Sequence, residues 1–397
     1  MTASGIKIPQ RAIPTRSFQA GESIGAIDAL RGYAILLVLA AHSVPPSLVW
    51  PARRVLLMGF FGVQLFFIAS AVTLLMSWAR SKEELGVKSG RFFIHRFFRI
   101  APLYFLAIVF YWVIDKTAST DFSLPRLLST LFFVNTWTPH LLPTTGGWKP
   151  VPGGWSISVE FCFYFVFPLL AMLVTTMRRT LAFCAIALVI MIAATTYGQL
   201  LYPEITSAQR ENFLYFWFPN QLVVFAIGFL LYRCLQSRYI CGLVASTRLS
   251  APVASACMVA AMIGLSYSGL QKEGIAPTHL LMTICFAAWA FVVLLNPGRL
   301  VVNPVITAIG KVSFSIYIVH FAVLKLVTHG MDAWWPIGKE GVLSLFYTAV
   351  SVLLALGISY ALASMTYRTI EKPFIQLGKR FAGGFVAGAA TGQRSSV

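Results

Sequence analysis

The stretch DALRGYAILLVLAAHS, residues 28–43, combines a long apolar run with two ionisable side chains. Such a run is typical of a membrane-spanning helix, yet Arg31 stands near its start and His42 near its end. An ionisable group inside a membrane costs on the order of 2.5–3.5 kcal/mol on insertion scales, and such groups usually serve a function. The stretch therefore predicts a transmembrane helix that carries functional residues.

The composition extends this prediction to the whole chain. Of the 397 residues, 58% are hydrophobic and 11% are charged, whereas soluble domains carry about 25% charged residues. We therefore expect an all-α, polytopic membrane helix bundle with a single transmembrane domain over residues 27–374. Ten runs are long enough, or nearly so, to cross the bilayer; they lie at about 27–44, 55–78, 100–115, 155–176, 180–201, 219–235, 250–269, 279–296, 305–327 and 341–366.

The charge distribution orients these helices. Most of the 31 basic residues fall on one set of connecting segments, which the positive-inside rule makes cytoplasmic. Both termini then face the cytoplasm, with residues 1–26 as an N-terminal tail and residues 375–397 as a C-terminal tail that we expect to be disordered. The net charge of +18 has its explanation in this topology, so we expect no nucleic-acid partner.

The remaining composition narrows the chemistry. None of the six cysteines forms a CxxC pair, so we expect neither a disulfide framework nor a metal site. The polar, basic N-terminus contains no apolar core and does not read as a cleavable signal peptide. The segment LLSTLFFVNTW (127–137) is too short to span and predicts a re-entrant or interfacial helix.

One carboxylate, Glu160, lies inside an apolar run, GGWSISVEFCFYFVFP. With alternating helix directions, we expect it near the outer face at the same depth as His42. Arg31 precedes His42 by eleven residues, about 16 Å and three turns of a helix, so both project from nearly the same face. Simpler readings stay open. In these readings Arg31 only pairs with Asp28 or extends to the membrane surface, and His42 is a hydrogen-bonded core histidine.

A basic cluster stands in SGRFFIHRFFRIAPLY, residues 89–104. Arg91, His95, Arg96 and Arg99 gather there, and the spacing of Arg96 and Arg99 suits a phosphate group. Alternatively, these residues are topology anchors, with the neighbouring phenylalanines in the membrane interface.

Six motifs together resemble the acyltransferase 3 family of membrane acyltransferases. Arg31 and His42 match its basic residue and its histidine, which have ten residues between them. The others are FFIASA (66–71, with Ala71 where glycine is usual), RFFRIAP (96–102), WSISVE (155–160), SFSIYIVH (313–320) and YRTIEKP (367–373). Each motif is weak alone, but their order and spacing are specific.

The resemblance implies an O-acyltransferase of the bacterial inner (cytoplasmic) membrane. It would move an acyl group, most often acetyl, from acyl-CoA to a sugar hydroxyl of an extracytoplasmic or lipid-linked glycan, as in polysaccharide O-acetylation. Acetyl-CoA would be a co-substrate, and no cofactor would be bound permanently. Its anionic end would lie against Arg31, Arg96 and Arg99.

The chemistry assigns two catalytic residues. Acyl transfer to a hydroxyl needs a base, and His42 is our prediction for it. Glu160 would orient or charge-balance His42. His320, in SFSIYIVH, is counted among the substrate-binding residues. Ser156 and Ser158 flank Glu160, but nothing marks either as an activated nucleophile.

The long connection 116–154 predicts an extracytoplasmic lid that selects the acceptor. It offers Trp137 and Trp148, and Trp155 follows it directly. Aromatic faces suit sugar rings, so Trp148 and Trp155 are predicted to bind the acceptor. The alternative places these tryptophans in the interfacial belt.

Two rival functions remain at this point. The intramembrane ionisable groups would also serve an exporter or flippase of a glycolipid or polysaccharide precursor, although no inverted repeat is visible in the sequence. The second rival is a purely structural or scaffolding role, which would give the intramembrane ionisable groups no function. The acceptor, the acyl chain length and the oligomeric state stay open.

Overall fold

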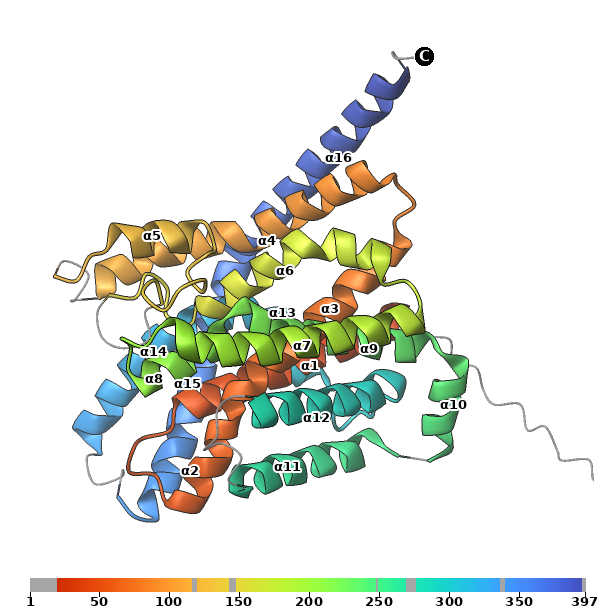
Figure 1. Ribbon diagram of the computed structural model, residues 1–397. Helices are drawn as coiled ribbons and strands as arrows, with labels where there is room; N and C mark the ends of the chain where they lie inside the picture. Colours follow the sequence, from red (N-terminus) through yellow and green to blue (C-terminus); the bar gives the residue numbers. More distant parts are fainter. Residues whose placement is uncertain are drawn as a thin grey trace, which may run out of the picture.

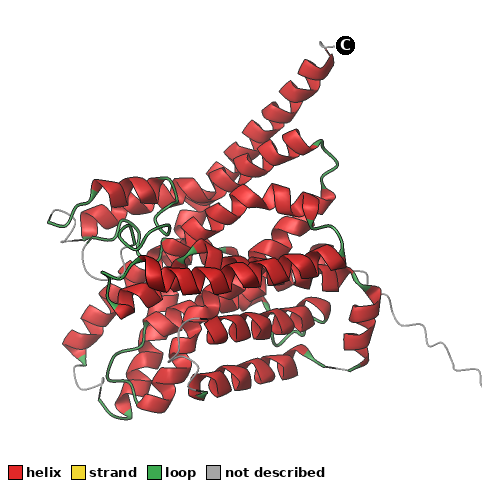
Figure 2. Cartoon of the chain, in the orientation of Figure 1, coloured by secondary structure: helices red, strands yellow, loops and turns green. Residues whose placement is uncertain are grey.

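The computed structural model describes residues 20–115, 120–142, 148–247, 249–268, 276–335 and 340–394. Within these ranges the chain contains helices and loops and no strand (Figure 2). The long helices lie side by side in one bundle (Figure 1). The all-α class is thereby confirmed.

The first half of the bundle contains α1 (Ala20–His42), α2 (Trp50–Leu57), the 3₁₀ turn η1 (Met58–Phe61), α3 (Gly62–Arg80), α4 (Leu85–Ile114), α5 (Leu124–Leu131), α6 (Trp155–Leu173), α7 (Met177–Leu201) and α8 (Ser207–Phe216). The second half contains α9 (Phe218–Gln236), α10 (Arg238–Ser246), α11 (Ala251–Tyr267), α12 (Ala276–Leu295), α13 (Pro304–Lys311), α14 (Ser313–Trp334), α15 (Leu343–Thr366), the π-helical segment η4 (Tyr367–Glu371) and α16 (Lys372–Arg394).

Nine helices of the described ranges are long and apolar enough to cross a membrane, or ten if the bent pair α10–α11 forms one span. This agrees with the ten runs expected from the sequence, and the protein is a multi-pass membrane protein. The topology relative to the cytoplasm remains a prediction. The helix expected at 100–115 is much longer, because α4 begins at Leu85 and runs for 30 residues. The charged residues before position 100 lower its hydropathy without breaking the helix.

The structure confirms one further expectation, a helix too short to span near 127–137, with shifted bounds, and revises another. The segment predicted at 127–137 is the eight-residue helix α5, which is about 12 Å long and too short to span. The tail expected to be disordered from residue 375 is helical to Arg394, while residues 395–397 lie outside the described residues. α16 packs along α4, where the rings of Phe98 and Phe381 stack 5.4 Å apart. This aromatic contact with α4 stabilises a helix that its composition alone did not predict.

Helices α1 and α13 cross at unusually close range. A Cβ atom at Gly310 would overlap the main-chain oxygen of Asp28, and one at Gly32 would overlap that of Ile306. Only glycine permits this approach, which fixes the middle of α1, around Arg31, against α13.

We expect Gly310→Ala to lower the free energy of unfolding by about 1–3 kcal/mol, because the backbone of α1 must move. Gly330→Ala, in α14, is the matched control, since a Cβ there meets no atom within 4 Å. Thermal unfolding of both variants in detergent would measure the difference. Equal melting temperatures would show that the crossing tolerates a side chain.

Candidate active site

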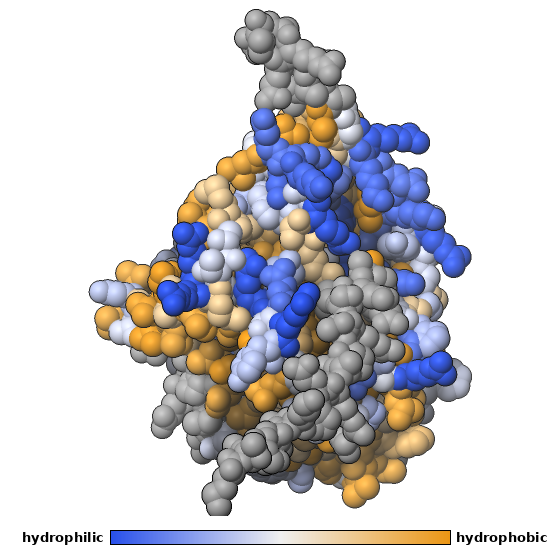
Figure 3. Space-filling view, turned by 90° about the vertical axis from the view of Figure 1, so that its right-hand side faces the viewer, coloured by the Kyte–Doolittle hydropathy of each residue, from blue (hydrophilic) through white to orange (hydrophobic). Residues whose placement is uncertain are grey.

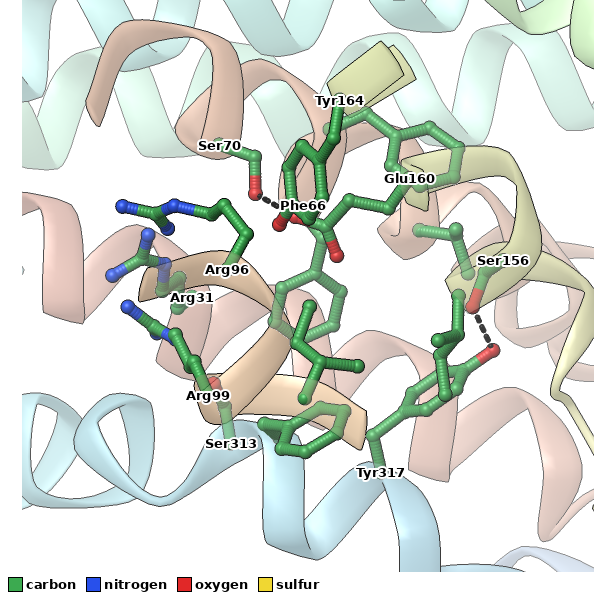
Figure 4. Close-up of a pocket in the computed structure, with 15 residues that line it drawn as sticks. Arg31, Phe66, Ser70, Arg96, Arg99, Ser156, Glu160, Tyr164, Ser313 and Tyr317 are labelled. Atoms are coloured by element: carbon green, nitrogen blue, oxygen red, sulfur yellow. Dashed lines mark hydrogen bonds between the residues drawn. The ribbon is translucent and has the colours of Figure 1, made fainter. Parts of the chain in front are cut away.

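A pocket opens where α1, α3, α4, α6 and α14 meet (Figure 4). The arginines predicted to hold an anionic donor line one side of it, and Glu160 lies opposite them. The residues labelled in the figure are Arg31, Phe66, Ser70, Arg96, Arg99, Ser156, Glu160, Tyr164, Ser313 and Tyr317. Five of the six sequence motifs, that of the first helix included, therefore contribute residues to one site.

The charged groups of Arg31 and Arg96 are only partly paired within the described chain. Arg31 lies 3.7 Å from the Asp28 carboxylate and donates a hydrogen bond to Thr73 Oγ1 at 3.2 Å. Arg96 stands over the rings of Phe92 and Tyr164 at 5.8 and 5.9 Å. Its buried Nε has no hydrogen-bond partner among the described residues. A buried, charged donor without a partner is costly, so this side of the pocket suits an anionic ligand.

Glu160 belongs to this pocket, and the structure does not bring it to His42. Its carboxylate accepts a hydrogen bond from Ser70 at 2.6 Å and interacts electrostatically with Arg31 and Arg96. α3, which carries Ser70, packs against both α1 and α6. The structure thus places Glu160 close to Arg31 and not at the depth of His42 as expected, because Ser70, its partner, lies one turn along α3 from Thr73, the partner of Arg31. A direct orientation of His42 by Glu160 is not seen in the described chain.

His42 instead pairs with His320. The two rings lie 5.3 Å apart, and Phe60 and Phe321 contact the His42 ring at 4.8 and 4.6 Å. His42 ends α1 and is half-buried, whereas His320 is fully buried in α14. The structure therefore brings together two residues that the sequence had assigned to separate tasks.

The main chain sets the tautomer of both rings. Nδ1 of His42 lies 2.8 Å from the carbonyl oxygen of Val38, and Nδ1 of His320 lies 2.7 Å from that of Tyr317. A carbonyl only accepts, so each Nδ1 carries the proton of the neutral ring and each Nε2 keeps its lone pair. Nε2 of His320 has no partner among the described residues. Both histidines thus present a basic nitrogen.

Tyr317 separates the pocket from the histidine pair. Its ring lines the pocket and lies 5.4 Å from that of His320. Its hydroxyl receives a hydrogen bond from Ser156 at 2.8 Å and donates one to the main-chain oxygen of Gly153 at 2.9 Å. The sequence reading missed Tyr317, as well as Ser70 and Tyr164, although Tyr317 lies three residues before His320 in the same motif.

The predicted acceptor-binding tryptophans do not share one environment. Trp148 is fully buried, and its ring packs against Trp112 and Phe122 at centroid distances of 4.9 and 5.4 Å. Its ring therefore offers no free face to a sugar, because these side chains cover it. Trp155 is half-buried and stacks on Phe216 at 4.2 Å.

Only part of the predicted lid can be compared with the structure. Residues 116–119 and 143–147 of the 116–154 connection lie outside the described residues. Trp137 is exposed. Across the described ranges, no group of three or more His, Cys, Asp or Glu residues is arranged to hold a metal ion.

Comparison with known proteins shows the family to which the chain belongs. The model of a family described as "Acyltransferase domain" matches residues 24–364. A relative, "Acyltransferase MdmB" of Streptomyces mycarofaciens, is 25% identical over 385 residues, which cover 89% of this chain and 92% of that protein. No solved structure gives a significant match. The matched span contains both the arginine pocket and the histidine pair, and the chain belongs to the acyltransferase 3 family of membrane acyltransferases.

Proposed function

We propose that this acyltransferase moves an acetyl group from acetyl-CoA to a sugar hydroxyl of an extracytoplasmic or lipid-linked glycan, in the bacterial cytoplasmic membrane. One observation carries the proposal. The single helix α1 bears Arg31 of an anion-binding pocket and, eleven residues on, His42 with a basic nitrogen. The separation is about 16 Å along the helix. A long donor with an anionic head and a thioester tip matches this arrangement.

The residues divide the work as follows. Arg31, Arg96 and Arg99 bind the diphosphate of the donor, and Glu160 balances their charge. The pantetheine arm extends past Tyr317 toward the histidine pair, where Trp155 and His320 border the acceptor side. A cytoplasmic donor thereby reaches an acceptor on the other side of the membrane.

The chemical step uses the free lone pair of His42. Its Nε2 takes the proton of the acceptor hydroxyl while the oxygen attacks the thioester carbonyl carbon. The carbon–sulfur bond then breaks, coenzyme A leaves as a thiolate, and the imidazolium returns the proton to the sulfur. His320 accepts a hydrogen bond from a neighbouring hydroxyl of the sugar through its own Nε2 and so orients the acceptor.

The proposal is tested with purified protein and acetyl-CoA labelled in the acetyl group. We expect label to pass to a glycan acceptor as an ester that mild alkali releases. An exporter or flippase would leave the thioester intact. An alkali-stable amide product would contradict transfer to a hydroxyl. Mass spectrometry of surface glycans with and without the gene would identify the acceptor.

Arg96→Ala is expected to raise the dissociation constant of acetyl-CoA about 10- to 100-fold, since a lost charge-assisted hydrogen bond is worth about 1.5–3 kcal/mol. Arg178→Ala provides the control, because Arg178 is an exposed arginine near the start of α7 and does not line the pocket. Equilibrium binding of labelled acetyl-CoA measures both. Unchanged affinity in Arg96→Ala would reduce this residue to a topology anchor.

A further inference from the structure

A second pocket adjoins the first at the junction of α3 and α4. Arg96 lines both pockets, so the two share a wall. The second pocket is further lined by Trp78, Ser81, Lys88, Arg91 and His95. The proposed acyl transfer uses none of these five side chains.

The second pocket holds an excess of positive charge beside an aromatic ring. The ammonium of Lys88 lies 4.4 Å from the Trp78 ring centroid and donates to the main-chain oxygen of Ser81 at 3.1 Å. Arg91 lies 3 residues further along α4 and pairs with Glu83 at 2.6 Å. Both partners of that pair remain partly open to solvent, at 36% and 23% exposed side-chain area.

Lys88, Arg91 and His95 fall on one side of α4 at spacings of three and four residues. One carboxylate, Glu83, forms an ion pair with this group in the described chain. An ammonium and a guanidinium that converge in this way match the oxygens of a phosphomonoester. Glu83 would then compete with the phosphate for Arg91.

We propose that the second pocket binds the 3′-phosphate on the ribose of the acyl-CoA donor, with Lys88 and Arg91 as its main contacts and Trp78 beside the nucleotide. This assignment rests on the proposed function. Arg91 and Arg99 are eight residues apart on α4, about 12 Å. The two pockets would thus separate the monophosphate of the donor from its diphosphate.

The junction of α3 and α4 lies at the end of the bundle from which α16 projects (Figure 1). Figure 3 views the molecule from that side and shows hydrophilic side chains gathered on its upper half, below the projecting helix end. A water-soluble nucleotide therefore has polar surface to approach along before its acyl arm enters the bundle.

The test compares the binding of acetyl-CoA with that of 3′-dephospho-acetyl-CoA to the full-length protein in phosphatidylcholine vesicles. Wild-type protein should bind the dephospho compound about 10- to 100-fold more weakly, as expected for lost charge-assisted hydrogen bonds. Arg91→Ala and Lys88→Ala should each weaken acetyl-CoA binding and leave dephospho-acetyl-CoA binding unchanged, so that the ratio moves toward one.

Glu83→Gln gives a change of opposite sign. Because it removes the carboxylate that competes for Arg91, it should tighten acetyl-CoA binding about two- to fivefold without affecting the dephospho compound. Lys82→Ala is the matched control, since Lys82 is exposed in the same loop and does not line the pocket. It removes one positive charge and should leave both affinities at the wild-type value.

The outcomes separate this inference from the proposed function. If wild-type protein binds neither compound, the acyl-CoA donor itself is wrong and the subsite with it. If it binds both equally, or if Arg91→Ala weakens both alike, the subsite is wrong and the donor stands. A lipid headgroup is the other source of such a phosphate. If Arg91→Ala changed only how added phosphatidylglycerol affects the protein, and not the binding of acetyl-CoA, the pocket would bind the lipid headgroup instead.

Discussion

His42→Ala is expected to lower the turnover number 10²- to 10⁴-fold, the usual contribution of a positioned base. The dissociation constant of acetyl-CoA should stay close to wild type, because His42 lies outside the arginine pocket. The reason for the loss is the orientation of the ring. The carbonyl of Val38 holds the Nδ1 proton, and so Nε2 is free to take the proton of the acceptor.

Two variants sharpen this prediction. His329→Ala removes an exposed histidine from α14, the helix that carries His320, and should leave turnover unchanged. His320→Ala should lower turnover by less than His42→Ala and raise the KM for the acceptor, because His320 orients the sugar through a neighbouring hydroxyl. Single-turnover transfer of labelled acetyl groups, with thermal unfolding as the check on folding, measures all three. Near wild-type turnover in folded His42→Ala protein would contradict the assignment.

The sequence predicted the features that depend on local pattern. Membrane spans follow from runs of apolar residues, and the three donor arginines follow from motifs of fixed spacing. The structure gathers Arg31, Arg96 and Arg99 in one pocket. The helix α16 was missed because its stability comes from packing on α4. Such a contact between segments far apart in the chain leaves little trace in local composition.

The partners of the ionisable groups were harder to predict. Position can be counted along one helix, but neither the relative depth of residues on two helices nor which helices are neighbours follows from that count. Glu160 and His42 were assigned to each other on depth alone, whereas Glu160 meets Ser70 and His42 meets His320. The tautomer of each histidine depends on a main-chain carbonyl one turn away, which only the folded helix brings into position.

Trp148→Ala is expected to lower the free energy of unfolding by about 3–5 kcal/mol, the usual loss when a buried tryptophan is truncated. Its ring fills the space between Trp112 at the end of α4 and Phe122 in the connection that follows. These contacts hold the part of the connection around Trp148 against the end of α4. Removal of the ring should therefore loosen the connection without removing a contact to the acceptor.

Trp148→Phe separates packing from polar recognition. The buried Nε1 of Trp148 has no hydrogen-bond partner in the described chain, so the loss of this N–H should cost little while most of the aromatic packing remains. We expect Trp148→Phe to melt close to wild type and Trp148→Ala to melt well below it. The acceptor KM of both should be unchanged at a temperature where they are folded. Trp155→Ala, which changes a half-buried ring next to Ser156 of the pocket, should raise that KM instead. If Trp148→Ala kept its stability but raised the acceptor KM, the ring would turn toward the acceptor during catalysis, and the connection would act as a lid.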